Sequence, residues 1–101
     1  MITVSVDRKN LSIETEGHAN YAEKGSDIVC AAISALMWAL ICGLDDVCRT
    51  DKQFTCGSAF GKPYPSGSAQ RIAAEAVFRG VLHGIDAIAQ KYPNNVVIHY
   101  F

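Results

Sequence analysis

The chain has 101 residues, of which 50% are hydrophobic and 19% are charged, and its formal net charge is −1. This composition excludes a disordered chain and predicts a single domain, residues 1–101, around one hydrophobic core. The balanced charge excludes a general nucleic-acid binder, so we expect no direct nucleic-acid partner.

Nothing near the N-terminus predicts a targeting segment, because Met1 to Asp7 alternates like a strand and lacks a basic region followed by an apolar run. The longest apolar stretch, Ile28 to Leu44, is short for a bilayer span and contains polar and glycine residues. We therefore expect no membrane partner and a cytoplasmic location. Structural disulfides are rare in that reducing compartment, and no pair among Cys30, Cys42, Cys48 and Cys56 has Cys-x-x-Cys spacing. We expect no metal and no cofactor, and three of the four cysteines are interpreted as packing residues.

The first sixteen residues predict a β-hairpin. Apolar residues alternate with polar ones through Ile2, Val4 and Val6, and again through Leu11 and Ile13. The polar residues 7–10 form the turn between the two strands. Gly17 ends the second strand.

A long apolar helix is predicted next, capped by Ser26 or Asp27 and running to about Cys42, with Gly43 as the stop signal. Its apolar residues occur on all sides. Such a helix is buried all round, so we expect a second helix, or a second subunit, to cover what the sheet leaves open.

The remainder predicts a third strand over Gln53 to Phe60, a loop over Gly61 to Gly67, a second helix from about Ala69 to Lys91 capped by Ser68, and a final strand from Val96. The predicted apolar stripe of that helix consists of Ile72, Ala73, Ala76, Val77, Gly80, Val81, Gly84, Ile85 and Ile88. Its two glycines are expected to permit close packing against the first helix. The order ββαβαβ predicts a two-layer α/β sandwich, with both helices on one face of a mixed four-stranded sheet.

Cys30 is the candidate nucleophile. In the first turn of a helix, free backbone N–H groups and the positive end of the helix dipole favour the thiolate. The backbone N–H groups around Cys30 are also the expected donors to an oxyanion. The simpler interpretation is a small buried hydrophobic residue, the usual role of a free cysteine.

His18 follows the predicted second strand and could act as general base for a nearby thiol. The segment Ala19 to Gly25 has no periodicity, and Gly17 and Gly25 could be the hinges of a flap over the site. An ordinary connecting loop is an equal alternative. Tyr21 is expected to anchor the loop rather than to contact substrate.

Asp27 has two open interpretations: it could orient His18 in a triad, or it could cap the helix. Its charge would oppose thiolate formation if it lay close to the sulfur. Ser34 lies one turn after Cys30 and is interpreted as a supporting residue.

The segments Gly17-His18-Ala19, Gly25 and Asp27 to Leu36 resemble the ribosomal-processing cysteine protease family, Prp. The resemblance implies a small single-domain cysteine endopeptidase with Cys30 as nucleophile and His18 as base. It also implies a homodimer, and a substrate that is the N-terminal extension of a large-subunit ribosomal protein. Two other classes of function stay open. One is a non-catalytic, ribosome-associated peptide-binding module, and the other is a redox sensor centred on Cys30.

Overall fold

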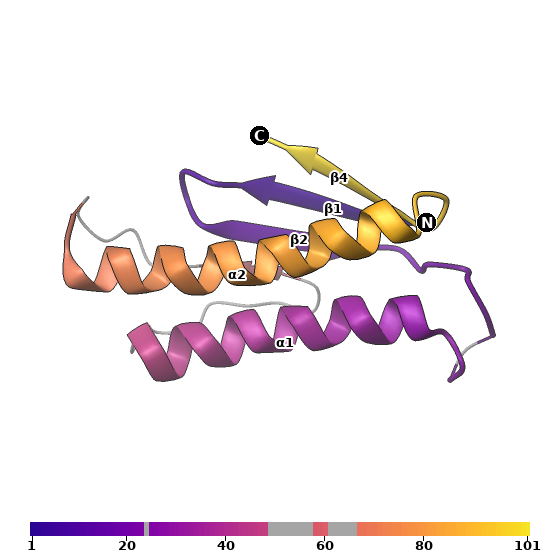
Figure 1. The fold of residues 1–101 in the computed structure, drawn as a ribbon, viewed down its shortest axis with the longest axis horizontal. Helices are drawn as coiled ribbons and strands as arrows, with labels where there is room; N and C mark the ends of the chain where they lie inside the picture. The colour runs from indigo at the N-terminus through magenta and orange to yellow at the C-terminus, as the bar shows by residue number, and fades with distance from the viewer. Residues whose placement is uncertain (24, 49–57, 61–66) are drawn as a thin grey trace.

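The computed structural model describes residues 1–23, 25–48, 58–60 and 67–101. The elements are β1 (Ile2–Asp7), β2 (Ser12–Glu16), α1 (Ile28–Cys48), β3 (Ser58–Phe60), α2 (Ala69–Lys91) and β4 (Val96–Tyr100). The two helices run side by side and pack against the sheet (Figure 1). The predicted α/β fold, with two helices packed against a sheet, is confirmed.

The sheet has the strand order β3-β2-β1-β4. It is mixed, because β1 pairs antiparallel with β2 and parallel with β4. Of the strand predicted over Gln53 to Phe60, the structure describes Ser58–Phe60, which pairs antiparallel with β2, and residues 53–57 lie outside the described part of the chain. The described sheet is mixed, as predicted, and consists of three strands of five or six residues and a three-residue edge strand.

The core lies between the sheet and the helices. Every second residue of β1 is buried, which matches the predicted alternation. The largest side chains that are fully buried are Val4, Val6, Ile13, Val29, Leu40, Phe78 and Ile85. The hairpin turn is closed by Asp7, whose carboxylate accepts hydrogen bonds from the backbone of Lys9 and from Asn10.

Helix α1 does not stop at Gly43, as the sequence analysis predicted, but continues to Cys48. Gly43 instead permits close packing between α1 and α2. A Cβ added at Gly43 would lie 2.9 Å from a methyl carbon of Val77 on α2. Gly84 plays the same role from the other side, where a Cβ would lie 3.0 Å from Leu36. The matching prediction for Gly80 is wrong, since open space surrounds it.

The predicted stripe of α2 is partly wrong. The buried residues of this helix are Ala74, Phe78, Val81, Leu82 and Ile85, whereas Ile72 is 61% exposed. Helix α2 contacts both α1 and the sheet, so its buried surface is rotated toward the sheet relative to the stripe. The Ser68 cap and the bounds of α2 are as predicted.

Helix α1 is also less buried than predicted. Trp38 is 58% exposed and Ile28 is 55% exposed, and the small residues Ala31, Ala35 and Ala39 lie on the surface. One face of this strongly apolar helix is therefore open to solvent in the single chain. Within the described residues, no helix is both long and apolar enough to cross a membrane.

Candidate active site

The loop between β2 and α1 begins and ends at glycines with positive φ, +85° at Gly17 and +92° at Gly25. Side chains rarely adopt this conformation, so glycine is required for a structural reason at both positions. At Gly17 space is also lacking, because a Cβ would lie 2.5 Å from the Met1 carbonyl oxygen. The amino group of Met1 donates a hydrogen bond to the His18 carbonyl, which ties the start of the loop to the start of β1.

Asp27 is the N-cap of α1. Its Oδ1 accepts hydrogen bonds from the backbone N–H groups of Val29 and Cys30, both at 3.0 Å. Its Oδ2 accepts from the backbone of Tyr21 at 3.1 Å and of Ala22 at 3.4 Å. One carboxylate therefore fastens the loop to the helix start. Of the two interpretations of Asp27, capping describes these contacts, and none of them involves His18.

The hydrogen bonds that Asp27 accepts lower its pKa from the usual 3.8, with the Cys30 N–H as the largest cause and the Tyr21, Ala22 and Val29 N–H groups as smaller ones. Partial desolvation acts in the opposite direction. A carboxylate that accepts several backbone N–H bonds is stabilised in its charged form. Asp27 is therefore ionised at neutral pH, beside the helix start that carries Cys30.

Cys30 is the third residue of α1, as predicted from an Asp27 cap. It is partly buried, and its Sγ accepts a hydrogen bond from the Ala19 N–H at 3.3 Å. An N–H that points at a sulfur stabilises negative charge there more than it stabilises a neutral thiol. The loop backbone, rather than the first turn of the helix, thus supplies the donor to this sulfur.

The predicted oxyanion donors are not available in this state. The N–H groups of Val29 and Cys30 are both held by Asp27 Oδ1, and the Ala31 N–H makes the first helical bond to the Asp27 carbonyl at 3.1 Å. The sequence analysis treated the Asp27 cap and the free N–H groups as compatible. In the structure, the cap takes the donors that an oxyanion would need.

His18 and Cys30 line the same open cavity, of about 560 Å³. The lining residues are His18, Asn20, Ala22, Gly25, Asp27, Cys30 and Ala31. The His18 side chain is exposed, and among the described residues the hydrogen-bond partner of the Cys30 sulfur is Ala19 rather than His18. The structure therefore brings together four of the predicted site residues: His18, Gly25, Asp27 and Cys30.

Two predicted residues lie elsewhere or have another contact. Ser34 is exposed and is not part of the cavity lining. Tyr21 packs edge-on against Tyr92 with ring centroids 5.3 Å apart, which supports the predicted anchoring role. Nothing in the sequence indicated a contact between Ala19 and Asn95, in which Asn95 Nδ2 donates a hydrogen bond to the Ala19 carbonyl at 2.9 Å. An alanine in a loop and an asparagine just before a strand carry no local signal of such a contact.

Cys42 is exposed, so its interpretation as a packing residue is wrong. It lies on α1 twelve positions after Cys30, about 18 Å along the helix at 1.5 Å per residue. Disulfide partners need Cα atoms within about 7 Å. Cys42 is therefore no resolving cysteine for Cys30 within one chain, and Cys56 lies outside the described residues. Within the described part of the chain, no group of three potential ligands could hold a metal ion.

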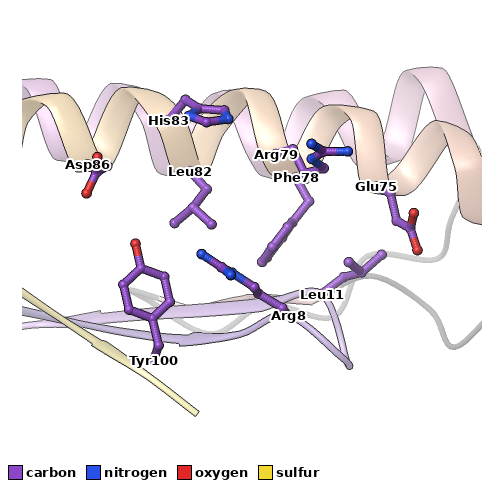
Figure 2. Close-up of a pocket in the computed structure, with 9 residues that line it drawn as sticks. All are labelled: Arg8, Leu11, Glu75, Phe78, Arg79, Leu82, His83, Asp86 and Tyr100. Atoms are coloured by element: carbon purple, nitrogen blue, oxygen red, sulfur yellow. The ribbon is translucent and has the colours of Figure 1, made fainter.

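A second cavity, of about 480 Å³, lies between α2 and the strands and contains none of the predicted site residues (Figure 2). Both apolar and charged residues line it: Arg8, Leu11, Glu75, Phe78, Arg79, Leu82, His83, Asp86 and Tyr100. The Arg8 guanidinium stacks 4.7 Å from the centre of the Tyr100 ring. Glu75 is bonded to Arg71, and Asp86 is bonded to Gln90. No cysteine is among the described residues that line this cavity, so the candidate active site is the one that contains Cys30.

A thiol at a helix start and a histidine that lines the same open cavity are the groups that a cysteine protease uses. The family model described as cysteine protease Prp matches residues 1–97 of the chain. This protein belongs to the Prp cysteine protease family. The predicted family, and with it the enzyme class of cysteine protease, is therefore confirmed.

Relatives of similar length agree with this membership. The chain is 31% identical to the ribosomal processing cysteine protease Prp of Mycoplasma genitalium, over 98% of this chain and 95% of that protein. It is 27% identical to the protein of the same name from Bacillus subtilis, over 91% of this chain and 87% of that protein. Both relatives are matched over nearly their whole length.

Solved structures share the fold. The structure of the ribosomal processing protease Prp from S. aureus with a covalently linked product peptide superposes with a TM-score of 0.79 at 23% identity, covering 100% of both chains. The same S. aureus protease with a substrate peptide gives a TM-score of 0.74 at 22% identity, again covering 100% of both chains. At these identities the likeness establishes the fold of the present chain.

Proposed function

We propose that the protein is a cysteine endopeptidase that removes the N-terminal extension of a large-subunit ribosomal protein. Cys30 is the nucleophile and His18 is the general base in this proposal. The observation that carries it is the cavity that both residues line, with the Ala19 N–H directed at the Cys30 sulfur. Family membership supports the chemistry, and the ribosomal processing role of the relatives supports the substrate.

The reaction proceeds in two steps. In the first, His18 takes the Cys30 proton, the sulfur attacks the scissile carbonyl carbon, and His18 returns the proton to the leaving amine. The extension is then held on Cys30 as a thioester. In the second step, His18 activates a water molecule that hydrolyses the thioester, which releases the extension with a new carboxylate and restores the thiol.

Asp27 has a supporting part in this reaction. Its carboxylate occupies the N–H groups of Val29 and Cys30 in the free protein. A tetrahedral intermediate that uses these donors must displace Asp27 Oδ1 from them. Because Oδ2 of the same carboxylate holds Tyr21 and Ala22, this displacement also loosens the loop. No role is assigned to Ser34.

The loop from Ala19 to Gly25 is the flap in this proposal, with Gly17 and Gly25 as its hinges. The positive φ of both glycines supports this, since a hinge concentrates conformational freedom at a few positions. We expect the flap to gain hydrogen-exchange protection when a substrate peptide binds. Equal exchange with and without peptide would count against a gating role.

The working form is a cytoplasmic homodimer of single-domain subunits. Ile28 and Trp38 are exposed apolar residues of α1, which supports the proposal that another subunit covers this face of the helix. A second copy of this chain is the proposed cover, because the family resemblance implies a homodimer.

The test is cleavage of a peptide that spans the extension junction of the large-subunit protein from the same organism. Wild type is compared with Cys30→Ala and His18→Ala, with circular dichroism as the folding control. Cleavage at one bond by wild type, and loss of at least about 10³-fold in each folded variant, is the expected result. Binding without cleavage in all three proteins would instead support a non-catalytic peptide-binding module.

A further inference from the structure

The turn between α2 and β4 is attached to the loop that carries His18, although the two are far apart in sequence. Asn95 Nδ2 donates a hydrogen bond to the Ala19 carbonyl at 2.9 Å. In addition, the ring of Tyr92 meets that of Tyr21 edge-on. The N-terminus, this turn and the β2–α1 loop all lie at one end of the molecule (Figure 1).

The backbone of Asn95 is itself fixed. Its carbonyl accepts a hydrogen bond from the Ile2 N–H at 2.8 Å, and its N–H donates to the Tyr92 carbonyl at 2.9 Å. The side-chain amide therefore projects from a backbone held by both β1 and the end of α2. A carbonyl oxygen only accepts hydrogen bonds, so the contact with Ala19 requires the NH₂ group that Asn95 provides.

Ala19 connects Asn95 to the candidate nucleophile, because it contacts both. It is 1% exposed, its carbonyl is bound by Asn95, and its N–H points at Cys30 Sγ at 3.3 Å. Ala19 also directly follows His18. Because Ala19 is held in place, the direction of its N–H toward the Cys30 sulfur is fixed. The backbone position of the adjacent His18 is fixed as well.

We propose that Asn95 is a positioning residue for the Cys30–His18 pair, an inference that rests on the proposed function. By holding the Ala19 carbonyl, Asn95 keeps the Ala19 N–H directed at the Cys30 sulfur. Because a hydrogen-bond donor interacts more strongly with a charged acceptor than with a neutral one, we expect this contact to make the Cys30 sulfur a better nucleophile. Asn95 does not touch the reacting atoms and acts through Ala19 alone.

The test compares Asn95→Asp with Asn94→Asp. The first substitution is nearly isosteric but replaces the donor to Ala19 by an acceptor. The second adds the same charge at the exposed neighbouring position of the same turn. Two readouts are measured: the rate of alkylation by iodoacetamide, resolved by mass spectrometry for each cysteine, and kcat and KM for the junction peptide.

Asn95→Asp is expected to slow alkylation of Cys30 about tenfold, which is the effect of losing the hydrogen bond from the Ala19 N–H to a charged sulfur. Cys42 is exposed further along the same helix and serves as an internal control whose rate stays unchanged. The value of kcat falls by a similar factor while KM is retained, because the peptide-binding surface is kept. Asn94→Asp behaves like wild type in both assays.

Unchanged Cys30 alkylation in folded Asn95→Asp overturns the proposal, as does an equal effect in Asn94→Asp. The alkylation readout does not depend on protease activity. If wild type fails to cleave the peptide but Asn95→Asp still slows Cys30 alkylation selectively, the proposed function fails and the positioning contact stands. Should Asn95→Asp not fold, hydrogen exchange of wild type decides: the Ala19 amide must exchange more slowly than that of exposed Asn20, and equal rates overturn the proposal.

Discussion

The carboxylate of Asp27 lies 3.0 Å from the backbone N–H of Cys30 and holds the helix start that carries the candidate nucleophile. The same carboxylate holds the backbone of Tyr21 and Ala22 in the loop. Replacement by asparagine separates the two functions. An asparagine oxygen can still cap α1, but its NH₂ group would face the two loop N–H groups as donor against donors. Asp27→Asn should therefore leave α1 intact and increase hydrogen exchange in the loop, whereas Asp27→Ala should also fray the first turn of α1.

The pH dependence of stability follows from the same contacts. The pKa of Asp27 is lowered from 3.8 in the folded protein, chiefly by the Cys30 N–H, so its contribution is present above pH 3.8 and is lost as the pH falls through the lower folded value. Asp27→Asn should flatten the loss of melting temperature below pH 3.8. Asp7, whose pKa is lowered mainly by the Asn10 side chain, contributes in the same pH window, so Asp7→Asn should flatten the loss as well. A double variant as acid-sensitive as wild type would contradict this assignment.

Gly43 and Gly80 form a matched pair of helical glycines. A Cβ at Gly43 would lie 2.9 Å from Val77, so Gly43→Ala should separate α1 from α2 and destabilise the protein by about 1–3 kcal/mol. Open space surrounds Gly80, so Gly80→Ala should stabilise the protein by up to about 1 kcal/mol through helix propensity alone. Urea unfolding measures both. Equal effects of the two substitutions would show that the helices do not pack closely at Gly43.

Gly17 and Gly25 test the two ends of the loop. Both have positive φ, so alanine at either position costs about 1–2 kcal/mol in backbone strain. A Cβ at Gly17 would in addition lie 2.5 Å from the Met1 carbonyl oxygen, whereas nothing lies within 4 Å of one at Gly25. Gly17→Ala should therefore destabilise more in thermal unfolding, and it should reduce peptide cleavage more because it displaces the backbone at His18. The reverse order would argue against the tight contact with Met1.

Trp38 on α1 and Ile72 on α2 are apolar residues of similar exposure, 58% and 61%, so substitutions at these two positions can be compared. If a second copy of the chain covers α1, Trp38→Asp should convert the dimer to a monomer, because a buried unpaired charge is costly at an interface. Ile72→Asp on α2 should leave the dimer intact. Light scattering after gel filtration measures the mass. A monomeric wild type, or a Trp38→Asp dimer of unchanged affinity, would contradict the proposed homodimer.

Features that depend only on residues close together in the sequence were predicted well. The alternation of β1, the Ser68 cap and the position of Cys30 relative to the Asp27 cap all follow from short-range chemistry. The end of α1 could not be predicted in this way. Gly43 has the sequence signature of a stop, but its reason is Val77, a residue on another helix.

The candidate site shows the same division. A Gly-His pair and a helix-start cysteine indicated His18 and Cys30, and these residues line one cavity. The contact of Asn95 with Ala19 depends on the packing of the α2–β4 turn against the loop, and no local pattern reports it. The predicted oxyanion donors are not free in this structure, because the Asp27 carboxylate caps the helix by accepting hydrogen bonds from the same N–H groups of Val29 and Cys30.

The most direct test of the account is to look for the thioester itself. Wild type, His18→Ala and Cys30→Ala are mixed with the junction peptide, quenched in acid at early times, and analysed by intact mass and peptide mapping. The account predicts an adduct with the mass of the extension on Cys30 in wild type, slower formation in His18→Ala, and none in Cys30→Ala. An adduct on another residue, or cleavage by Cys30→Ala at the wild-type rate, would contradict it.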